Sequence, residues 1–171
     1  MIMQMKIKGK KISTDSPTYF IADIAANHDG SLSRAIKLIN LAKKSGADAV
    51  KFQHHNVKKY VSDYGFKNLG KKLSHQKKWK KSIFQVYKDA EVPRSWTETL
   101  VKHCKKISIP FLSTPYDLDT ADYLNRYMPA FKVGSGDLAW DDMLKKISSK
   151  EKPFFIATGA STMKEVRHAV N

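Results

Sequence analysis

The chain has 171 residues, enough for one domain with a buried core, and its 42% hydrophobic content excludes disorder as the default state. Its formal net charge is +15, from 31 Lys and Arg against 16 Asp and Glu, so it should attract anions of any kind. The single cysteine, Cys104, excludes an internal disulfide and is typical of a reducing cytoplasm, and no stretch reaches the length of a membrane-spanning helix.

The predicted elements alternate between strand and helix. A short strand and turn at residues 5–9 precede five apolar runs, which predict buried strands at 19–25, 49–53, 109–113, 130–134 and 153–157. Helical patterns are expected at 32–45, 74–87, 93–106, 117–125, 141–148 and 162–170. This rhythm predicts an α/β fold with parallel strands that pair in sequence order, are buried on both faces and carry helices on the outside.

Every predicted strand ends in small or polar residues. These ends are Asn27-His28, Gln53-His54, Ser113-Thr114, Gly134-Ser135-Gly136 and Thr158-Gly159. In a parallel sheet or barrel they lie together at the edge where ligands bind. Because packing alone does not require polar residues at five equivalent points, we expect a functional site at this edge.

The fourth strand and its exit carry the most distinctive chemistry. Lys132 lies inside an apolar run, where a charge is costly unless an anion meets it. Gly134 and Gly136 let the backbone approach a ligand closely, and Ser135 and Asp137 add a hydroxyl and a carboxylate. This set suits a small phosphorylated or carboxylated substrate. The alternative is an ordinary strand-to-helix turn whose lysine reaches out to solvent.

Five motifs, in order along the chain, resemble the sialic acid synthase family. This family, also called N-acetylneuraminate synthases, includes legionaminate and pseudaminate synthases and spore-coat polysaccharide proteins. The motifs are Ile21-Ala22-Asp23 with Asn27-His28-Asp29-Gly30, Gly46-Ala47-Asp48-Ala49-Val50-Lys51-Phe52-Gln53, Phe111-Leu112-Ser113-Thr114-Pro115, Phe131-Lys132-Val133-Gly134-Ser135-Gly136-Asp137 and Ala157-Thr158-Gly159. The resemblance runs from about Tyr19 to the end of the chain.

The resemblance implies a (β/α)8 TIM-type barrel followed by a small antifreeze-like domain. Residues 19–171 would be the N-terminal portion of the barrel, about its first five β/α units, and residues 1–18 a strand-and-turn segment ahead of it. The barrel would be truncated after its fifth strand and the antifreeze-like domain absent. The chain is therefore expected to be an incomplete, inactive part of a cytoplasmic enzyme that is a homodimer at full length.

The activity that the resemblance implies is a transferase reaction for surface polysaccharide biosynthesis. Phosphoenolpyruvate condenses with an N-acetylated amino sugar aldose, such as N-acetylmannosamine, to give a nine-carbon 2-keto acid and phosphate. A divalent metal, Mn2+ or Mg2+, is expected to bind the aldehyde oxygen as a Lewis acid in the full-length enzyme. Phosphoenolpyruvate carries a phosphate and a carboxylate, so lysines and hydroxyls at strand ends suit it.

The same motifs imply the site residues. Those expected to contact phosphoenolpyruvate are Lys51, Gln53, Thr114, Lys132, Ser135 and, by a looser match, Thr158. Asp137, beside the reacting carbons, and Asp23, near the sugar, are the candidate catalytic residues and stand where the family commonly has glutamate. Each aspartate keeps the charge and shortens the reach by one methylene, which leaves the sugar specificity open.

Histidines of this chain are not expected to bind the metal. The family's two metal-binding histidines follow the fifth strand and would lie beyond Asn171, so we expect no metal site here. His168 falls in a helix, on the wrong side for the site. For His54 and His55 a solvent-facing loop is expected rather than ligand contact. Asn27 and His28 either border the site or only form a capping loop.

Two other function classes stay open from sequence alone. The charge of +15 and the aromatic residues among lysines at 58–88 would suit a basic nucleic-acid-binding module, but no such signature is present and neither nucleic acid nor membrane is expected as a partner. Paired lysines such as Lys80-Lys81 often form only a solvated coat. The chain could also be a non-catalytic relic or partner protein.

Overall fold

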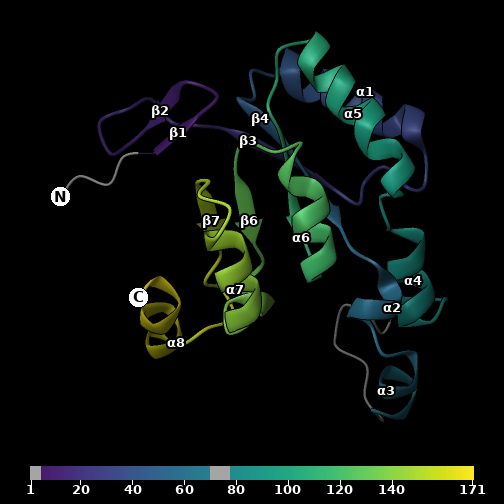
Figure 1. Ribbon diagram of the computed structural model, residues 1–171. Coiled ribbons are helices and arrows are strands. Elements are labelled where there is room, and N and C mark those ends of the chain that lie inside the picture. The colour runs from purple at the N-terminus through teal and green to yellow at the C-terminus, as the bar shows by residue number, and fades with distance from the viewer. Residues whose placement is uncertain (1–4, 70–77) are drawn as a thin grey trace.

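The computed structural model describes residues 5–69 and 78–171 and opens with a hairpin (Figure 1). Strands β1 (Met5–Ile7) and β2 (Lys10–Ile12) pair antiparallel. Lys8 and Gly9 join them with positive φ angles of 48° and 84°, as a tight hairpin turn requires. The strand and turn predicted at residues 5–9 are confirmed.

Five strands follow and lie in sequence order, as predicted, but they pair in two separate parallel ladders. The first three form one ladder: β3 (Ile21–Ala25), β4 (Ala49–His54) and β5 (Phe111–Pro115). A second parallel ladder joins β6 (Phe131–Val133) to β7 (Phe154–Ile156). Strands β5 and β6 lie side by side, but no ladder joins them in the described part of the chain. The strand β7 is only half-buried, contrary to the expectation of burial on both faces, because it is an outer strand.

Helices cover the strands on one side. The five longest helices are α1 (Leu32–Lys44), α5 (Arg94–Lys106), α6 (Leu118–Asn125), α7 (Asp141–Ser148) and α8 (Met163–Val170). Polar caps fix several of their starts: Ser31 caps α1, Asp117 caps α6, and Thr162 forms a capping box in α8. All five match helices that the sequence predicts, within a few residues.

Three short helices lie between β4 and α5. They are α2 (Val57–Tyr60), α3 (Asp63–Asn68) and α4 (Ile83–Asp89). A single helix at 74–87 was the expectation, and its start is wrong: Ser82 accepts a hydrogen bond from the Gln85 amide at 3.1 Å, so the helix begins at Ile83. Residues 74–77 lie outside the described residues. In Figure 1 these helices lie at the lower right and the β1–β2 hairpin at the upper left.

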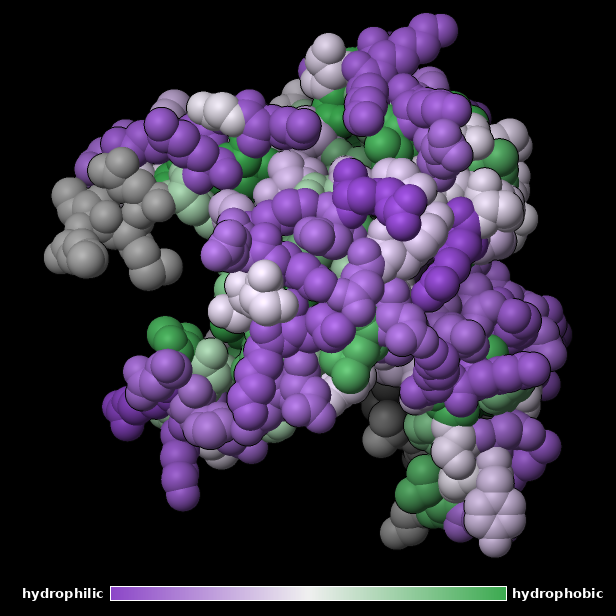
Figure 2. Space-filling view, viewed as in Figure 1, coloured by the Kyte–Doolittle hydropathy of each residue, from purple (hydrophilic) through white to green (hydrophobic). Residues whose placement is uncertain are grey.

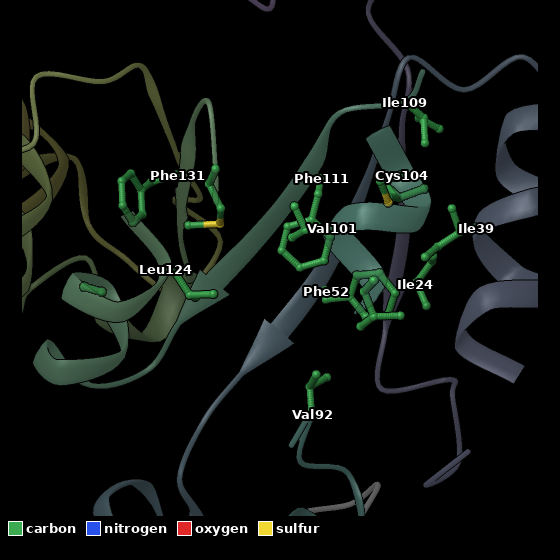
Figure 3. Close-up of a cluster of buried hydrophobic side chains, with 14 of the residues drawn as sticks. Ile24, Ile39, Phe52, Val92, Val101, Cys104, Ile109, Phe111, Leu124 and Phe131 are labelled. Carbon is green, nitrogen blue, oxygen red and sulfur yellow. The ribbon is translucent and has the colours of Figure 1, made fainter. Parts of the chain in front are cut away.

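The main hydrophobic core lies between the strands and the helices. Phe52 and Phe111 stack with ring centroids 5.5 Å apart, and Val101 of α5 lies beside them (Figure 3). Cys104 is buried in the same core, and burial raises the pKa of its thiol to about 12. A thiol held protonated in this way is a poor nucleophile.

The face of the molecule seen in Figure 2 is strongly hydrophilic. Figure 2 shows polar residues over most of the visible face, with small and separate apolar areas. Several lysines lie in ion pairs, for example Lys146 with Asp122 at 2.8 Å. Across residues 5–69 and 78–171, every helix is too short or too polar to span a bilayer.

Candidate active site

The strands present two different faces. Phe52 of β4 and Phe131 of β6 pack in the helix-facing core. Because side chains alternate along a strand, Lys51 and Gln53 on either side of Phe52, and Lys132 next to Phe131, point to the opposite face. That face is the interior of the curved sheet. The structure thus turns the three polar side chains predicted on β4 and β6 toward the same space.

Lys51 is paired with Asp23 across β3 and β4. The two residues are in register, and Lys51 Nζ lies 2.8 Å from Asp23 Oδ1. Lys51 is only 8% exposed, whereas the Asp23 side chain is 54% exposed. The register shifts between Asp23 and Ala25, and Ala25 has a positive φ of 48°. Such bulges redirect side chains next to functional sites, and here Asp23 can neutralise a buried lysine while it faces solvent.

Lys132 has no such partner. Among the residues that the structure describes, no carboxylate lies within ion-pair distance of its ammonium group. Burial lowers the pKa of Lys132, and the positive charge of Lys51 lowers it further, with Asp23 and Asp137 acting in the opposite direction. Two lysines therefore share one space in which only Lys51 has an ion-pair partner among the described residues, and this electrostatic setting favours an anionic ligand.

The turn after β6 brings Asp137 back over the strand end. Residues 135–137 form a 3-10 turn, and the Asp137 amide donates to the Gly134 carbonyl at 3.1 Å. A Cβ atom added at Gly134 would lie 2.8 Å from Asp137 Oδ2, so only glycine leaves room for this carboxylate. A Cβ atom added at Gly136 would have no neighbouring atom within 4 Å. Burial raises the pKa of Asp137, and Lys132 partly offsets the rise.

Hydroxyl groups complete the strand-end set. Thr114 pairs in register with Gln53 and is 1% exposed, yet its Oγ1 has no hydrogen-bond partner. A buried hydroxyl without a partner is costly, so a bound ligand would relieve it. A Cβ atom added at Gly159 would lie 3.9 Å from Ser135 Cβ, which shows that the turns after β6 and β7 meet. Thr158 is exposed in the second of these turns.

His54 and His55 are buried, so the expected solvent-facing loop is wrong for both. Strand β4 continues through His54, whose Nδ1 lies 2.8 Å from Ser113 Oγ and whose Nε2 lies 3.0 Å from Thr97 Oγ1. Burial lowers the pKa of His54 to about 3. His55 Nε2 donates to the Tyr87 carbonyl at 2.9 Å. Their ring nitrogens thus serve the packing of β4 against helices.

The loop between β3 and α1 is held by its own contacts. Asn27 Nδ2 donates to the Ile24 carbonyl at 2.9 Å, and buried His28 accepts from the Gly30 amide through Nδ1 at 3.1 Å. Burial lowers the pKa of His28, whose ring meets Trp96 edge-on at 5.6 Å. These contacts agree with the capping-loop interpretation. His28 Nε2 is buried without a hydrogen-bond partner.

No metal centre can be built from the described residues. Within 5–69 and 78–171, no group of three or more His, Cys, Asp or Glu side chains is arranged to hold an ion. His168 is on exposed α8 and pairs with Asp141, its Nε2 lying 3.0 Å from Oδ1. The donor set that a resident metal needs is therefore not provided by these residues.

Tyrosines that the sequence analysis did not select border the site. Tyr116 follows β5 directly, and its Cε1 would lie 3.7 Å from a Cβ atom at Gly134. Its ring centroid is 4.8 Å from that of Tyr60. Burial raises the pKa of both hydroxyls, to about 12 for Tyr60, and the nearby Asp137 charge contributes. The available signal was the position of Tyr116, immediately after a polar strand end.

Solved structures confirm the fold. The N-acetylneuraminic acid synthetase of Leptospira borgpetersenii, crystallised with citrate, superposes with a TM-score of 0.83 at 23% identity, over 99% of this chain and 54% of that one. The spore coat polysaccharide biosynthesis protein SpsE of Bacillus subtilis gives a TM-score of 0.74 at 31% identity, over 98% and 43% of the two chains. This chain is thus a partial barrel of the TIM type.

Sequence comparison extends the likeness. The N,N'-diacetyllegionaminic acid synthase of Campylobacter jejuni is 37% identical over 158 residues, 90% of this chain and 46% of that protein. A pseudaminic acid synthase of the same species is 30% identical over 90% of this chain and 45% of its own length. The chain spans about half the length of the curated relatives it matches. The NeuB family matches residues 38–171, and the chain belongs to this family.

Proposed function

We propose that this chain is the phosphoenolpyruvate-binding part of a synthase that condenses phosphoenolpyruvate with an N-acetylated amino sugar aldose. The products would be a 2-keto acid and phosphate, used for surface polysaccharide biosynthesis. Support comes from relatives named as legionaminic and pseudaminic acid synthases. The observation that carries the proposal is the pair of inward lysines, Lys51 on β4 and Lys132 on β6, the two strands on either side of β5.

The charges of the ligand match the charges of the site. Phosphoenolpyruvate has a phosphate and a carboxylate, and each could meet one lysine ammonium group in a partly desolvated space. Asp23 already neutralises Lys51 in part, so the unpaired Lys132 would gain most from the ligand. Charge-assisted hydrogen bonds of this kind are worth about 1.5–3 kcal/mol each.

Neutral groups would orient the ligand, and the Asp137 carboxyl group would accept and donate a proton. Thr114 Oγ1 and Ser135 could donate hydrogen bonds to ligand oxygens, and Gln53 lies beside Lys51 on the same face. The raised pKa of Asp137 brings its carboxyl group closer to the working pH, where a group can both take up and return a proton. Thr158 is exposed and would contribute least.

The divalent metal stays an expectation from the family resemblance. When bound, such an ion would polarise the aldehyde of the acceptor. The described residues hold no fitting donor set, so no step proposed here runs through the metal. We expect the 171-residue chain to bind phosphoenolpyruvate without forming a keto acid in the presence of Mn2+. A thiobarbiturate assay for the keto acid would test this, and product formation would contradict it.

Calorimetry can test the proposed binding. The chain is titrated with phosphoenolpyruvate, inorganic phosphate and pyruvate at the same ionic strength. We expect phosphoenolpyruvate to bind at least about tenfold more tightly than either single-charge-group ligand, because only it engages both lysines. Lys51→Met should remove this advantage, while Lys106→Met on the exposed end of α5 should keep it. Equal affinities for phosphoenolpyruvate and phosphate would overturn the proposal.

A further inference from the structure

A hollow of about 360 Å³ lies at the amino ends of β3, β4 and β5, opposite to the proposed phosphoenolpyruvate site. Residues of the β1–β2 hairpin, of the end of α5 and of the link from α5 to β5 form its walls (Figure 1). The volume is near the lower limit of small-molecule pockets, which is roughly 300 Å³. The hollow therefore has room for a small ligand, and the residues that line it take no part in the proposed function.

The inner wall of the hollow is apolar. It includes Ile7, Tyr19, Cys104, Ile109 and Pro110. Ile7 and Cys104 are each 1% exposed, and Figure 3 shows Cys104 and Ile109 side by side. The half-buried ring of Tyr19 adds an aromatic face to this wall. The deep part of the hollow therefore favours an apolar group over water.

The end of α5 beside the hollow is closed by its own hydrogen bonds. The Ser108 amide donates to the Lys105 carbonyl at 3.1 Å, and the Ile109 amide donates to the Cys104 carbonyl at 3.0 Å. The Ser108 carbonyl accepts from Lys43 Nζ at 3.0 Å. Because these carbonyl groups already have donors, they do not call for a water or a cation in the hollow.

The mouth of the hollow is positively charged. Three exposed lysines line it, Lys8, Lys10 and Lys105, and Asp48 is the one carboxylate among its described lining residues. Lys10 is ion-paired with Asp48, which also accepts from the Phe20 amide at 2.8 Å. In the part of the chain that the structure describes, no carboxylate lies within ion-pair distance of Lys8 or Lys105. These two ammonium groups favour an anionic group at the mouth.

We propose that this hollow is a binding site for a small carboxylate with an apolar body, separate from the site of the proposed function. The apolar body would lie against the inner wall, and the carboxylate would meet Lys8 or Lys105 at the mouth. The Ser108 hydroxyl lines the same hollow and could donate a hydrogen bond to the carboxylate. Phosphoenolpyruvate is highly charged and has little apolar surface, so it is not expected to enter.

Methyl NMR of the full 171-residue chain tests the site with matched probes. Hexanoate has the apolar body and the charge, 1-hexanol has only the body, and acetate has only the charge. We expect hexanoate to shift the Ile7 and Ile109 methyl signals in a saturable way and to bind at least about threefold more tightly than 1-hexanol. Acetate and phosphoenolpyruvate should cause no such shift. Ile147, which is buried in α7 outside the hollow, provides the reference signal.

Two neighbouring lysines of α5 provide a matched pair of variants. Lys105→Met removes a charge from the mouth and should weaken hexanoate about threefold while leaving 1-hexanol unchanged. Lys106→Met changes an exposed lysine that does not line the hollow and should alter neither probe. Because both positions are exposed, both variants should fold. Higher salt should reduce the preference of the unchanged chain for hexanoate.

Equal binding of hexanoate and 1-hexanol, or equal effects of Lys105→Met and Lys106→Met, would overturn the inference. Saturable shifts with acetate would also overturn it, because they would indicate contact with lysines alone. Shifts at Ile147 as large as those at Ile7 would do the same, because they would indicate unspecific apolar binding. Hexanoate binding here without phosphoenolpyruvate binding would support this site and count against the proposed function, and the reverse result would have the opposite meaning.

Discussion

The two ends of the same parallel strands carry opposite chemistry. Toward the amino end, the inward residues Ala49, Leu112 and Ala130 form an apolar cluster with Ile7 of the β1–β2 hairpin, and Leu112 is in register with Lys51 on β4. Toward the carboxyl end, the same faces carry lysines, a hydroxyl without a partner and a half-buried carboxyl group. Leu112 and Thr114 are two residues apart on β5. We therefore propose that one strand contributes to stability at one end and to binding at the other, as in other barrels of this type.

The largest expected effect is at Lys132. Lys132→Met keeps most of the side-chain volume and removes the charge from a partly buried site, so the affinity for phosphoenolpyruvate should fall about 100-fold. Lys80→Met changes an exposed lysine, whose field is screened beyond roughly 8–10 Å, and should cost less than about threefold. Calorimetry at low and moderate salt measures both. A folded Lys132→Met chain with nearly unchanged affinity would remove the basis for the lysine site.

Leu112 and Thr114 provide the sharpest contrast of the two ends. Leu112→Ala should lower the free energy of unfolding by about 2–5 kcal/mol by opening a cavity, with little change in ligand affinity of the folded chain. Thr114→Val removes a buried hydroxyl without a partner, so the free energy of unfolding should stay equal or rise by about 1 kcal/mol. The same change should lower the affinity for phosphoenolpyruvate about tenfold. Urea unfolding and calorimetry give both quantities. The comparison fails if Thr114→Val is strongly destabilising.

Two glycines of one turn should respond differently. Gly134→Ala places a methyl 2.8 Å from Asp137 Oδ2, so the carboxylate must move, and we expect a loss of about 1–3 kcal/mol of stability. Gly136→Ala meets nothing within 4 Å and should be neutral or stabilising by up to about 1 kcal/mol. Thermal unfolding of the two variants measures the difference. Equal losses would show that Asp137 does not occupy this position.

The smallest effect concerns the charge of Asp137. Its pKa is raised in the folded chain, mainly by burial, so the group stabilises the fold below its unfolded pKa and this contribution is lost as pH rises through the folded pKa. Asp137→Asn should therefore raise the melting temperature at neutral pH, and the gain should vanish in acid. Melting curves from pH 3 to 7.5 would record it. A variant less stable than wild type at neutral pH would instead point to a dominant attraction between Asp137 and Lys132.

The sequence predicts the strands and most of the lysine site because both depend on local patterns. Apolar runs mark β3 to β7, and alternation along β4 and β6 places Lys51 and Lys132 on one face. The start of α4 depends on the Ser82 cap, and the helical pattern of apolar residues and lysines continues ahead of Ser82, so the sequence predicts a start that is too early. The burial of His54 could not be predicted, because Thr97 and Ser113, its partners, lie far along the chain.

The cluster of tyrosine rings next to the site could not be predicted from the sequence, for a similar reason. Tyr60, Tyr87 and Tyr116 are distant in sequence and meet only once α2 and α4 fold over the end of β4. In the sequence they resemble scattered loop aromatics among lysines. Only the position of Tyr116 after a polar strand end offered a local signal.

Mapping the phosphoenolpyruvate contacts by backbone amide NMR tests the central claim most directly. The claim is that the anion binds at the carboxyl ends of the strands and that the apolar amino end takes no part. We predict that phosphoenolpyruvate causes saturable shifts at Lys51, Thr114, Lys132 and Ser135. At Ile7 and Ala49 we predict no shift larger than the one that sodium chloride causes at the same ionic strength. Shifts concentrated at the hairpin, or spread evenly over exposed lysines without saturation, would contradict the account.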